Sequence, residues 1–305
     1  QMSPKNPLII VAPSPTPFKQ DQVDFSAIEH NVERWMTTDL DGFVLGTENG
    51  EETYLSEKER LDIVRHVSEM TDRRKWVIAG IDSPSVTDTL RQSEQLAESG
   101  ADMIRLRIPR RKEEIFRYFE QVVPRISIPV IVIHQPKPGF FDTGLASTGA
   151  EPEAIIEAVS RENVYGYICS GNVRVEARVR LHFPENKSFW ASNGSLLLST
   201  STLAVNGACL MLGNILPETC KRLLQAMRQD DLRQAREIHQ RIIEADWEVL
   251  KHGAAGIKAA LTILGFQMGP PRDPSLPITK EQIDVLERVL KQADAFSEFK
   301  NSHST

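Results

Sequence analysis

Residues 41–67 read DGFVLGTENGEETYLSEKERLDIVRHV and contain one complete strand–loop–helix pattern. It opens with an apolar run, Asp41–Gly46, and ends in a segment whose apolar residues recur at helical spacing. Ser56 precedes Glu59 by three residues, the spacing of a capping box, in which each side chain bonds a backbone N–H at the start of a helix. The stretch therefore predicts a strand, a polar loop and a capped helix in succession.

The same unit recurs along the chain. Short apolar runs, often β-branched, alternate with helical patterns, as expected for strands of a parallel sheet that are buried on both faces. The predicted strands are Leu8–Pro13, Asp41–Gly46, Lys75–Ile81, Asp102–Pro109, Ile128–Pro136, Val164–Ser170, Ser188–Asn193 and Gly207–Gly213. Such alternation forms a closed barrel or an open doubly wound sheet. No G-x-G-x-x-G follows a strand, which weakens the dinucleotide-binding alternative.

The chain after Gly213 is helical and longer than an eighth strand–helix unit needs. The predicted helices are Pro217–Gln229, Asp231–Lys251, Ala254–Leu264 and Lys280–Phe296. We therefore predict an α/β fold, a (β/α)₈ TIM barrel with a C-terminal helical extension. Residues 1–216 would form the barrel, and residues 217–305 its last helix and the extension, within a single domain unit.

The composition and the charge indicate where the protein resides and which classes of partner it lacks. Of the 305 residues, 40% are hydrophobic and 26% charged, an ordinary balance for a soluble domain. The formal charge of −6 gives no general attraction to nucleic acid or anionic membranes, and no apolar run reaches the roughly 20 residues that span a bilayer. Residues 1–7 lack the apolar stretch of a signal peptide, and the three cysteines show no disulfide framework. We expect a cytoplasmic protein with neither a nucleic-acid nor a membrane partner.

Several short motifs occur in a characteristic order. They are Thr16-Pro17-Phe18, Asn49-Gly50-Glu51, Leu55-Ser56-Glu57-Lys58-Glu59-Arg60, Asn214-Ile215-Leu216-Pro217-Glu218 and Ile257-Lys258-Ala259-Ala260-Leu261. With them, roughly residues 8–296 resemble the dihydrodipicolinate synthase/N-acetylneuraminate lyase family of class I aldolase-type TIM barrels. The resemblance implies a lyase or synthase scaffold and a homo-oligomer, a dimer or a tetramer.

The resemblance also implies a mechanism whose parts are not all present. In that family a lysine on the sixth strand forms a Schiff base with pyruvate, a fifth-strand tyrosine relays protons, and a Ser/Thr of the second-strand motif supports it. Here Ile168 falls on the lysine, Ile133 on the tyrosine and Glu48 on the hydroxyl residue. No lysine occurs between Lys137 and Lys187. Because isoleucine cannot form an imine, we predict that family-type Schiff-base catalysis is absent.

Polar residues at the ends of the predicted strands are the candidate site, because TIM-barrel active sites lie at the carboxyl ends of the strands. The candidate catalytic groups are Glu48 and His134. The candidate groups for binding a small anion, such as a carboxylate, are Asn49, Arg107, Arg110, Arg111, Lys137 and Asn193. Further polar groups at strand ends are Glu51, Asp82, Cys169 and Ser170.

Each of these residues also has a purely structural interpretation. Arg105 and Arg107 share one face of an apolar strand, and a buried arginine needs either an anionic ligand or an ion-pair partner such as Glu48. Glu48 in turn is either a general base with a raised pKa or the partner of Arg107. His134 is an acid–base group or, because alternation with Ile133 turns it away from the barrel axis, the partner in a structural hydrogen bond.

The sequence gives little support for another lysine, a cysteine or a metal ion that could take over the role of the missing lysine. Lys137 lies between two prolines beyond a strand end, and Lys258 lies in a helical motif with a structural role. Cys169 has no activating partner nearby in sequence, so a buried inert thiol is the favoured interpretation. A divalent metal held by Glu48, Asp82, His134 and Cys169 has no support from local spacing. We therefore predict neither a metal nor a cofactor.

Three hypotheses remain open at this point. The chain is an enzyme with changed acid–base chemistry on a small carboxylate, a catalytically inactive homologue that binds a small ligand, or a lyase that retains activity through a metal. The charged replacements favour the first hypothesis, and the missing nucleophile favours the second.

Overall fold

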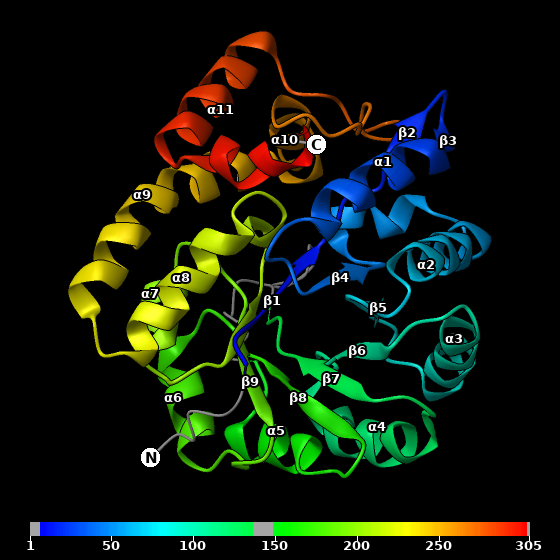
Figure 1. Cartoon of the computed structure of the whole chain (residues 1–305). Coiled ribbons are helices and arrows are strands. Elements are labelled where there is room, and N and C mark those ends of the chain that lie inside the picture. Colours follow the sequence, from blue (N-terminus) through cyan, green and yellow to red (C-terminus); the bar gives the residue numbers. More distant parts are fainter. Residues whose placement is uncertain (1–6, 137–148, 304–305) are drawn as a thin grey trace.

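The computed structural model describes residues 7–136 and 149–303. Its eight long strands are all parallel and close into a barrel, with β1 paired to both β4 and β10 (Figure 1). The strands are β1 (Ile9–Pro13), β4 (Gly42–Leu45), β5 (Trp76–Ile81), β6 (Met103–Arg107), β7 (Val130–Ile133), β8 (Val164–Ile168), β9 (Ser188–Ala191) and β10 (Gly207–Cys209). The predicted TIM barrel is confirmed.

Helices follow the strands and surround the barrel (Figure 1). They are α1 (Phe25–Met36), α2 (Glu57–Thr71), α3 (Val86–Glu98), α4 (Ile115–Val122), α5 (Pro152–Val159), α6 (Val173–Leu181), the short α7 (Leu197–Ser201) and α8 (Pro217–Arg228). The predicted capping box opens α2. The Ser56 hydroxyl accepts a bond from the Glu59 N–H at 3.1 Å, and Glu59 Oε2 accepts one from the Ser56 N–H at 2.8 Å.

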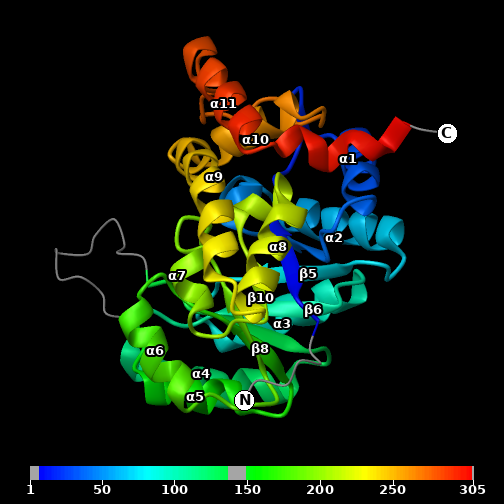
Figure 2. The same ribbon diagram turned by 60° about the vertical axis from the view of Figure 1, so that its left-hand side comes forward.

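The C-terminal extension consists of α9 (Leu232–Leu250), α10 (Gly253–Ile263), α11 (Lys280–Gln292) and a 3₁₀ segment, η6 (Ala295–His303). Figure 2 shows α9 beside α8, with α10 and α11 farther along the chain at one side of the barrel. The last predicted helix therefore ends earlier than expected and continues as η6. The sequence analysis also missed the two-residue strands β2 (Phe18–Lys19) and β3 (Gln22–Val23), which are too short to show a pattern. In the described residues, no helix combines the length and apolarity needed to cross a membrane.

The barrel interior is a separate apolar core. It contains Ile9, Val11, Val44, Ile78, Met103, Ile131, Ile133, Ile168, Trp190 and Cys209. Ile133 and Ile168 are paired across β7 and β8, so they lie side by side in this interior. Successive strand residues face opposite sides, so Arg105 and Arg107 share the inward face of Met103. The remaining buried apolar residues pack between the barrel and its helices.

Glu298 of η6 connects the end of the chain to the start of α8. Its carboxylate accepts bonds from the Glu218 N–H at 2.6 Å and from the Thr219 hydroxyl at 2.6 Å. A carboxylate suits a helix N-terminus because the first N–H groups of a helix lack intrahelical partners. Burial nevertheless raises the pKa of Glu298 to about 7.

Replacing Glu298 by glutamine is expected to flatten the dependence of stability on pH. The folded-state pKa lies above the ordinary value of 4.5, so the folded protein retains a proton that the unfolded chain releases. The stabilisation from Glu298 is therefore complete below about pH 4.5 and is lost as the pH rises through about 7. Between pH 5 and 8 the wild type should lose about 2 kcal/mol relative to Glu298→Gln. Urea unfolding at pH 5 and pH 8 measures the free energy of unfolding, and Glu94→Gln, at an exposed position, is the control. An equal loss of stability in wild type and in Glu298→Gln between these pH values would contradict the prediction.

Candidate functional site at the barrel mouth

A pocket of about 650 Å³, partly open to solvent, lies at the carboxyl ends of the strands. One wall is polar and comes from the ends of β4 to β7 and the loops that follow them. It contains Thr47, Glu48, Asn49, Asp82, Arg105, Arg107 and Gln135. The other wall is largely apolar and contains Pro13, Cys209, Leu210, Met211 and Leu250. The fold thus brings the candidate residues Glu48, Asn49 and Arg107 to one pocket.

Arg105 is held by Asp82. Its Nη2 lies 2.7 Å from Asp82 Oδ1, and its side chain is 3% exposed. The register pairs Gly80 with Arg105, which places Asp82, just beyond β5, beside the end of β6. A Cβ on Gly80 would lie 2.4 Å from Arg105 Nη2, so glycine leaves the space that this guanidinium occupies. The carboxylate that pairs with Arg105 is therefore that of Asp82, where the sequence analysis named Glu48.

The positive charge of Arg107 is less well compensated by neighbouring carboxylates than that of Arg105. Its Nε and Nη2 both donate to Gln135 Oε1, at 3.2 and 2.5 Å, and its Nη1 lies 3.7 Å from Asp82 Oδ2. The side chain is 16% exposed, and burial lowers the pKa of the guanidinium, which the charge of Asp82 only partly opposes. A buried cation whose nearest acceptor is a neutral amide is an electrostatic reason for an anion to bind.

Two buried polar atoms lining this pocket have no hydrogen-bond partner within the described part of the chain. They are the Thr47 hydroxyl and Arg105 Nε. Beside them, burial raises the pKa of the Glu52 carboxyl, and the charges of Asp82 and Glu48 add to the rise. Sequence reasoning did not single out Glu52, because it follows a 3₁₀ turn, η1 (Glu48–Gly50), and no periodic pattern marks it.

The structure places His134 away from this pocket. Its ring is 3% exposed and lies between β7 and α6, with Nδ1 3.0 Å from Glu176 Oε1 and 3.0 Å from the Tyr167 hydroxyl. The Ala150 N–H donates to Nε2 at 3.0 Å, so Nε2 is the unprotonated nitrogen and Nδ1–H donates to Glu176. Tyr167 and Glu176 were not predicted, because the pairing of His134 with Glu176 spans 42 positions of sequence. His134 therefore does not belong to the group formed by Glu48 and Arg107.

The remaining binding candidates lie at the edge of the site or outside it. Asn193 Oδ1 accepts a bond from the Leu196 N–H at 3.2 Å, and its neighbour Ser192 lines the pocket instead. Arg110 and Arg111 are exposed, and Arg111 lies 3.9 Å from Glu114. Lys137 lies outside the described residues.

The geometry does not favour Cys169 as a nucleophile or a divalent metal site among the described residues. Cys169 is buried, and burial raises the pKa of its thiol well above the usual range, as expected for an inert thiol. Among residues 7–136 and 149–303, no group of three or more His, Cys, Asp or Glu side chains is arranged to hold a metal ion.

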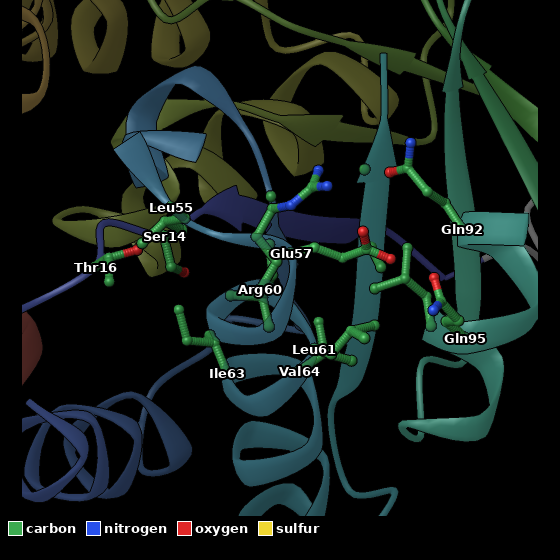
Figure 3. Close-up of a pocket in the computed structure, with 15 residues that line it drawn as sticks. Ser14, Thr16, Leu55, Glu57, Arg60, Leu61, Ile63, Val64, Gln92 and Gln95 are labelled. Atoms are coloured by element: carbon green, nitrogen blue, oxygen red, sulfur yellow. The ribbon is translucent and has the colours of Figure 1, made fainter. Parts of the chain in front are cut away.

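A second pocket, of about 500 Å³, lies in the layer between the barrel and its helices (Figure 3). Ile63 and Val64 of α2 line it together with Gln92 and Gln95 of α3 (Figure 3). Leu45, Ile63, Val64, Ala79 and Leu96 of the main core line it, together with the polar residues Ser14, Thr16, Glu57, Arg60, Gln92 and Gln95. We therefore assign the candidate site to the barrel mouth, where the charged residues converge.

The chain matches the model of the Dihydrodipicolinate synthetase family over residues 6–293. It is a member of the dihydrodipicolinate synthetase family. A 4-hydroxy-tetrahydrodipicolinate synthase of Archaeoglobus fulgidus is 26% identical over 289 residues, which cover 92% of this chain and 96% of that protein.

Solved structures of the dihydrodipicolinate synthetase family share the fold. A prophage protein of the dihydrodipicolinic acid synthase family from E. coli K12, in complex with pyruvate, has a TM-score of 0.82 at 23% identity, covering 94% of this chain and 99% of that one. A structure described as the first monomeric dihydrodipicolinate synthase variant has a TM-score of 0.85 at 19% identity, covering 95% and 97%. At these identities the likeness shows the fold alone.

Three lysines of this dihydrodipicolinate synthetase family member, two half-buried and one buried, are held by partners within the fold. Lys75 donates to the Leu40 carbonyl before β4, and Lys187 donates to the Val164 carbonyl at the start of β8. Both therefore lie at the amino ends of the strands, opposite the mouth. Lys258 of α10 is 2% exposed, and its Nζ lies 2.5 Å from Glu51 Oε2.

Proposed function

We propose that this member of the dihydrodipicolinate synthetase family forms no lysine Schiff base and binds a small carboxylate at the barrel mouth. The observation that carries the proposal is the pairing of Ile133 with Ile168 in the barrel interior, beside a pocket that contains Arg105 and Arg107. By resemblance, the two isoleucines occupy the positions of the family's tyrosine and lysine. Neither side chain has an atom that attacks a carbonyl or transfers a proton.

The polar wall supports acid–base chemistry in place of an imine. Glu48 lines the pocket together with Arg107, which suits a general base beside an anchored carboxylate. A proton removed by Glu48 would leave negative charge on the substrate, and the guanidinium group of Arg107 would stabilise that charge. The reaction class proposed is therefore proton transfer, including lyase-type elimination, on a small carboxylate.

A catalytically inactive, ligand-binding homologue is the second candidate. The ion pair of Arg105 with Asp82 and the apolar filling of the barrel interior favour it, because both are structural roles for positions that face the site. Any turnover that Glu48→Gln abolishes while ligand binding persists would decide against this candidate.

We also propose a cytoplasmic homo-oligomer, a dimer or a tetramer. Large apolar side chains on the surface support an interface: Trp247 is 64% exposed and Leu276 is 80% exposed. The monomeric variant among the solved structures shows that oligomerisation does not follow from the fold. Light scattering after size-exclusion chromatography measures the mass in solution.

Replacing Arg107 by glutamine is expected to weaken the binding of pyruvate, used as a reversible carboxylate ligand, by about 10- to 100-fold. The reason is the loss of a charge-assisted hydrogen bond in a buried pocket, worth about 1.5–3 kcal/mol. Isothermal titration calorimetry measures the affinity. The matched control, Arg125→Gln, removes an equal charge from an exposed arginine beyond α4 and should leave binding unchanged. Equal affinities in all three proteins would exclude Arg107 as the anchor.

A further inference from the structure

The barrel-mouth pocket has two chemically different walls, and this difference bears on the ligand. The polar wall contains Arg107 and Glu48, whereas the opposite wall contains Leu210, Met211 and Leu250. Leu210 and Met211 belong to the turn after β10, and Leu250 ends α9, so two separate elements converge to form the apolar wall.

A small anion alone would contact only the polar wall of this pocket. Acetate bound at Arg107 would leave water against the apolar wall, whereas an apolar substituent on the same molecule would displace that water. The pocket volume of about 650 Å³ includes solvent at its open mouth, and it exceeds the volume of a carboxylate group. Specific pockets for small molecules commonly pair one anchoring polar group with a larger apolar surface.

The two arginines have different capacities to act as the anchor. Arg105 is almost fully buried and lies 2.7 Å from Asp82, so its charge is already compensated. Arg107 donates twice to the neutral amide oxygen of Gln135 and is more exposed. Arg107 is therefore the arginine of this pocket whose positive charge is less fully compensated.

We infer that the ligand is a monocarboxylate with an apolar substituent, its carboxylate on Arg107 and its substituent along Leu210, Met211 and Leu250. This inference rests on the proposed function, because it concerns the same anion site. It adds a specificity determinant: the apolar wall selects for substituent length, and Arg107 selects for the carboxylate.

The test is a calorimetric titration of the full chain with acetate, butanoate and hexanoate, and with hexan-1-ol as the neutral probe. Affinity is expected to increase about two- to fourfold per added methylene, as for partly or fully buried CH₂ groups. Hexan-1-ol should bind at least about tenfold more weakly than hexanoate. Leu250→Asn should reduce the increase in affinity with chain length. The control Leu181→Asn changes a leucine of α6 that is 72% exposed and should behave as wild type.

The outcomes separate this inference from the proposed function. Equal affinity for acetate and hexanoate, lost in Arg107→Gln, would overturn the inference and leave the anion site standing. Equal affinity for hexanoate and hexan-1-ol would overturn the role of Arg107. The absence of binding by every carboxylate, pyruvate included, would overturn both. The wild-type series decides the inference even if Leu250→Asn fails to fold.

Discussion

Replacing Lys258 by methionine is expected to lower the free energy of unfolding by about 3–5 kcal/mol. The side chains of Lys258 and Glu51 are 2% and 3% exposed, and their Nζ and Oε2 atoms are 2.5 Å apart. Methionine fills most of the space but leaves the Glu51 carboxylate buried without its cation. Glu51 also accepts a bond from the Arg272 N–H at 2.9 Å, so losing its cation should loosen the contact between the loop after β4 and the C-terminal extension.

Urea unfolding of wild type and variant measures this loss, and Lys280→Met, at an exposed position that opens α11, provides the control. The double variant Glu51→Met with Lys258→Met should be more stable than Lys258→Met alone, because no buried charge then remains unpaired. A loss below about 1 kcal/mol in the single variant, typical of exposed ion pairs, would contradict the account.

Replacing Asp82 by asparagine is expected to lower stability by about 2–3 kcal/mol and to strengthen carboxylate binding about tenfold or more. Stability falls because Arg105, with 3% of its side chain exposed, loses its charged partner. Affinity rises because Asp82 also lies 3.7 Å from Arg107 and competes there with the ligand. The two effects have opposite signs, which a merely damaged fold would not produce.

Pyruvate titration and urea unfolding on the same preparation measure both effects. The control Asp88→Asn removes a carboxylate from an exposed ion pair with Arg91 and should change stability by less than about 1 kcal/mol. Weaker pyruvate binding in Asp82→Asn would show that Asp82 supports the ligand rather than competing with it.

The barrel could be predicted from sequence because strand and helix periods are local signals. The run Asp41–Gly46 and the capping box of Ser56 and Glu59 each depend on residues within a few positions of one another. The hairpin of β2 and β3 was missed because two-residue strands have no period. The end of the last helix was misplaced because Asp294, with a φ of 58°, interrupts it before η6, and an aspartate does not mark such a break by residue type.

The site was only partly predictable, because its pairings are set by strand register and packing. That Glu48, Asn49 and Arg107 meet follows from their places at strand ends. The choice of Asp82 as the partner of Arg105 depends on the register between β5 and β6, which no local pattern specifies.

Trapping with pyruvate and borohydride distinguishes a chain that forms a lysine Schiff base from one that does not, and we propose that this chain does not. The protein is incubated with pyruvate, reduced, and its intact mass measured beside the Archaeoglobus fulgidus relative as positive control. We expect an unmodified mass for this chain, because by the family resemblance Ile168, in the barrel interior on β8, takes the position of the family's lysine. A pyruvyl adduct that peptide mapping assigns to a lysine would contradict it and identify the amine that has replaced the lost nucleophile.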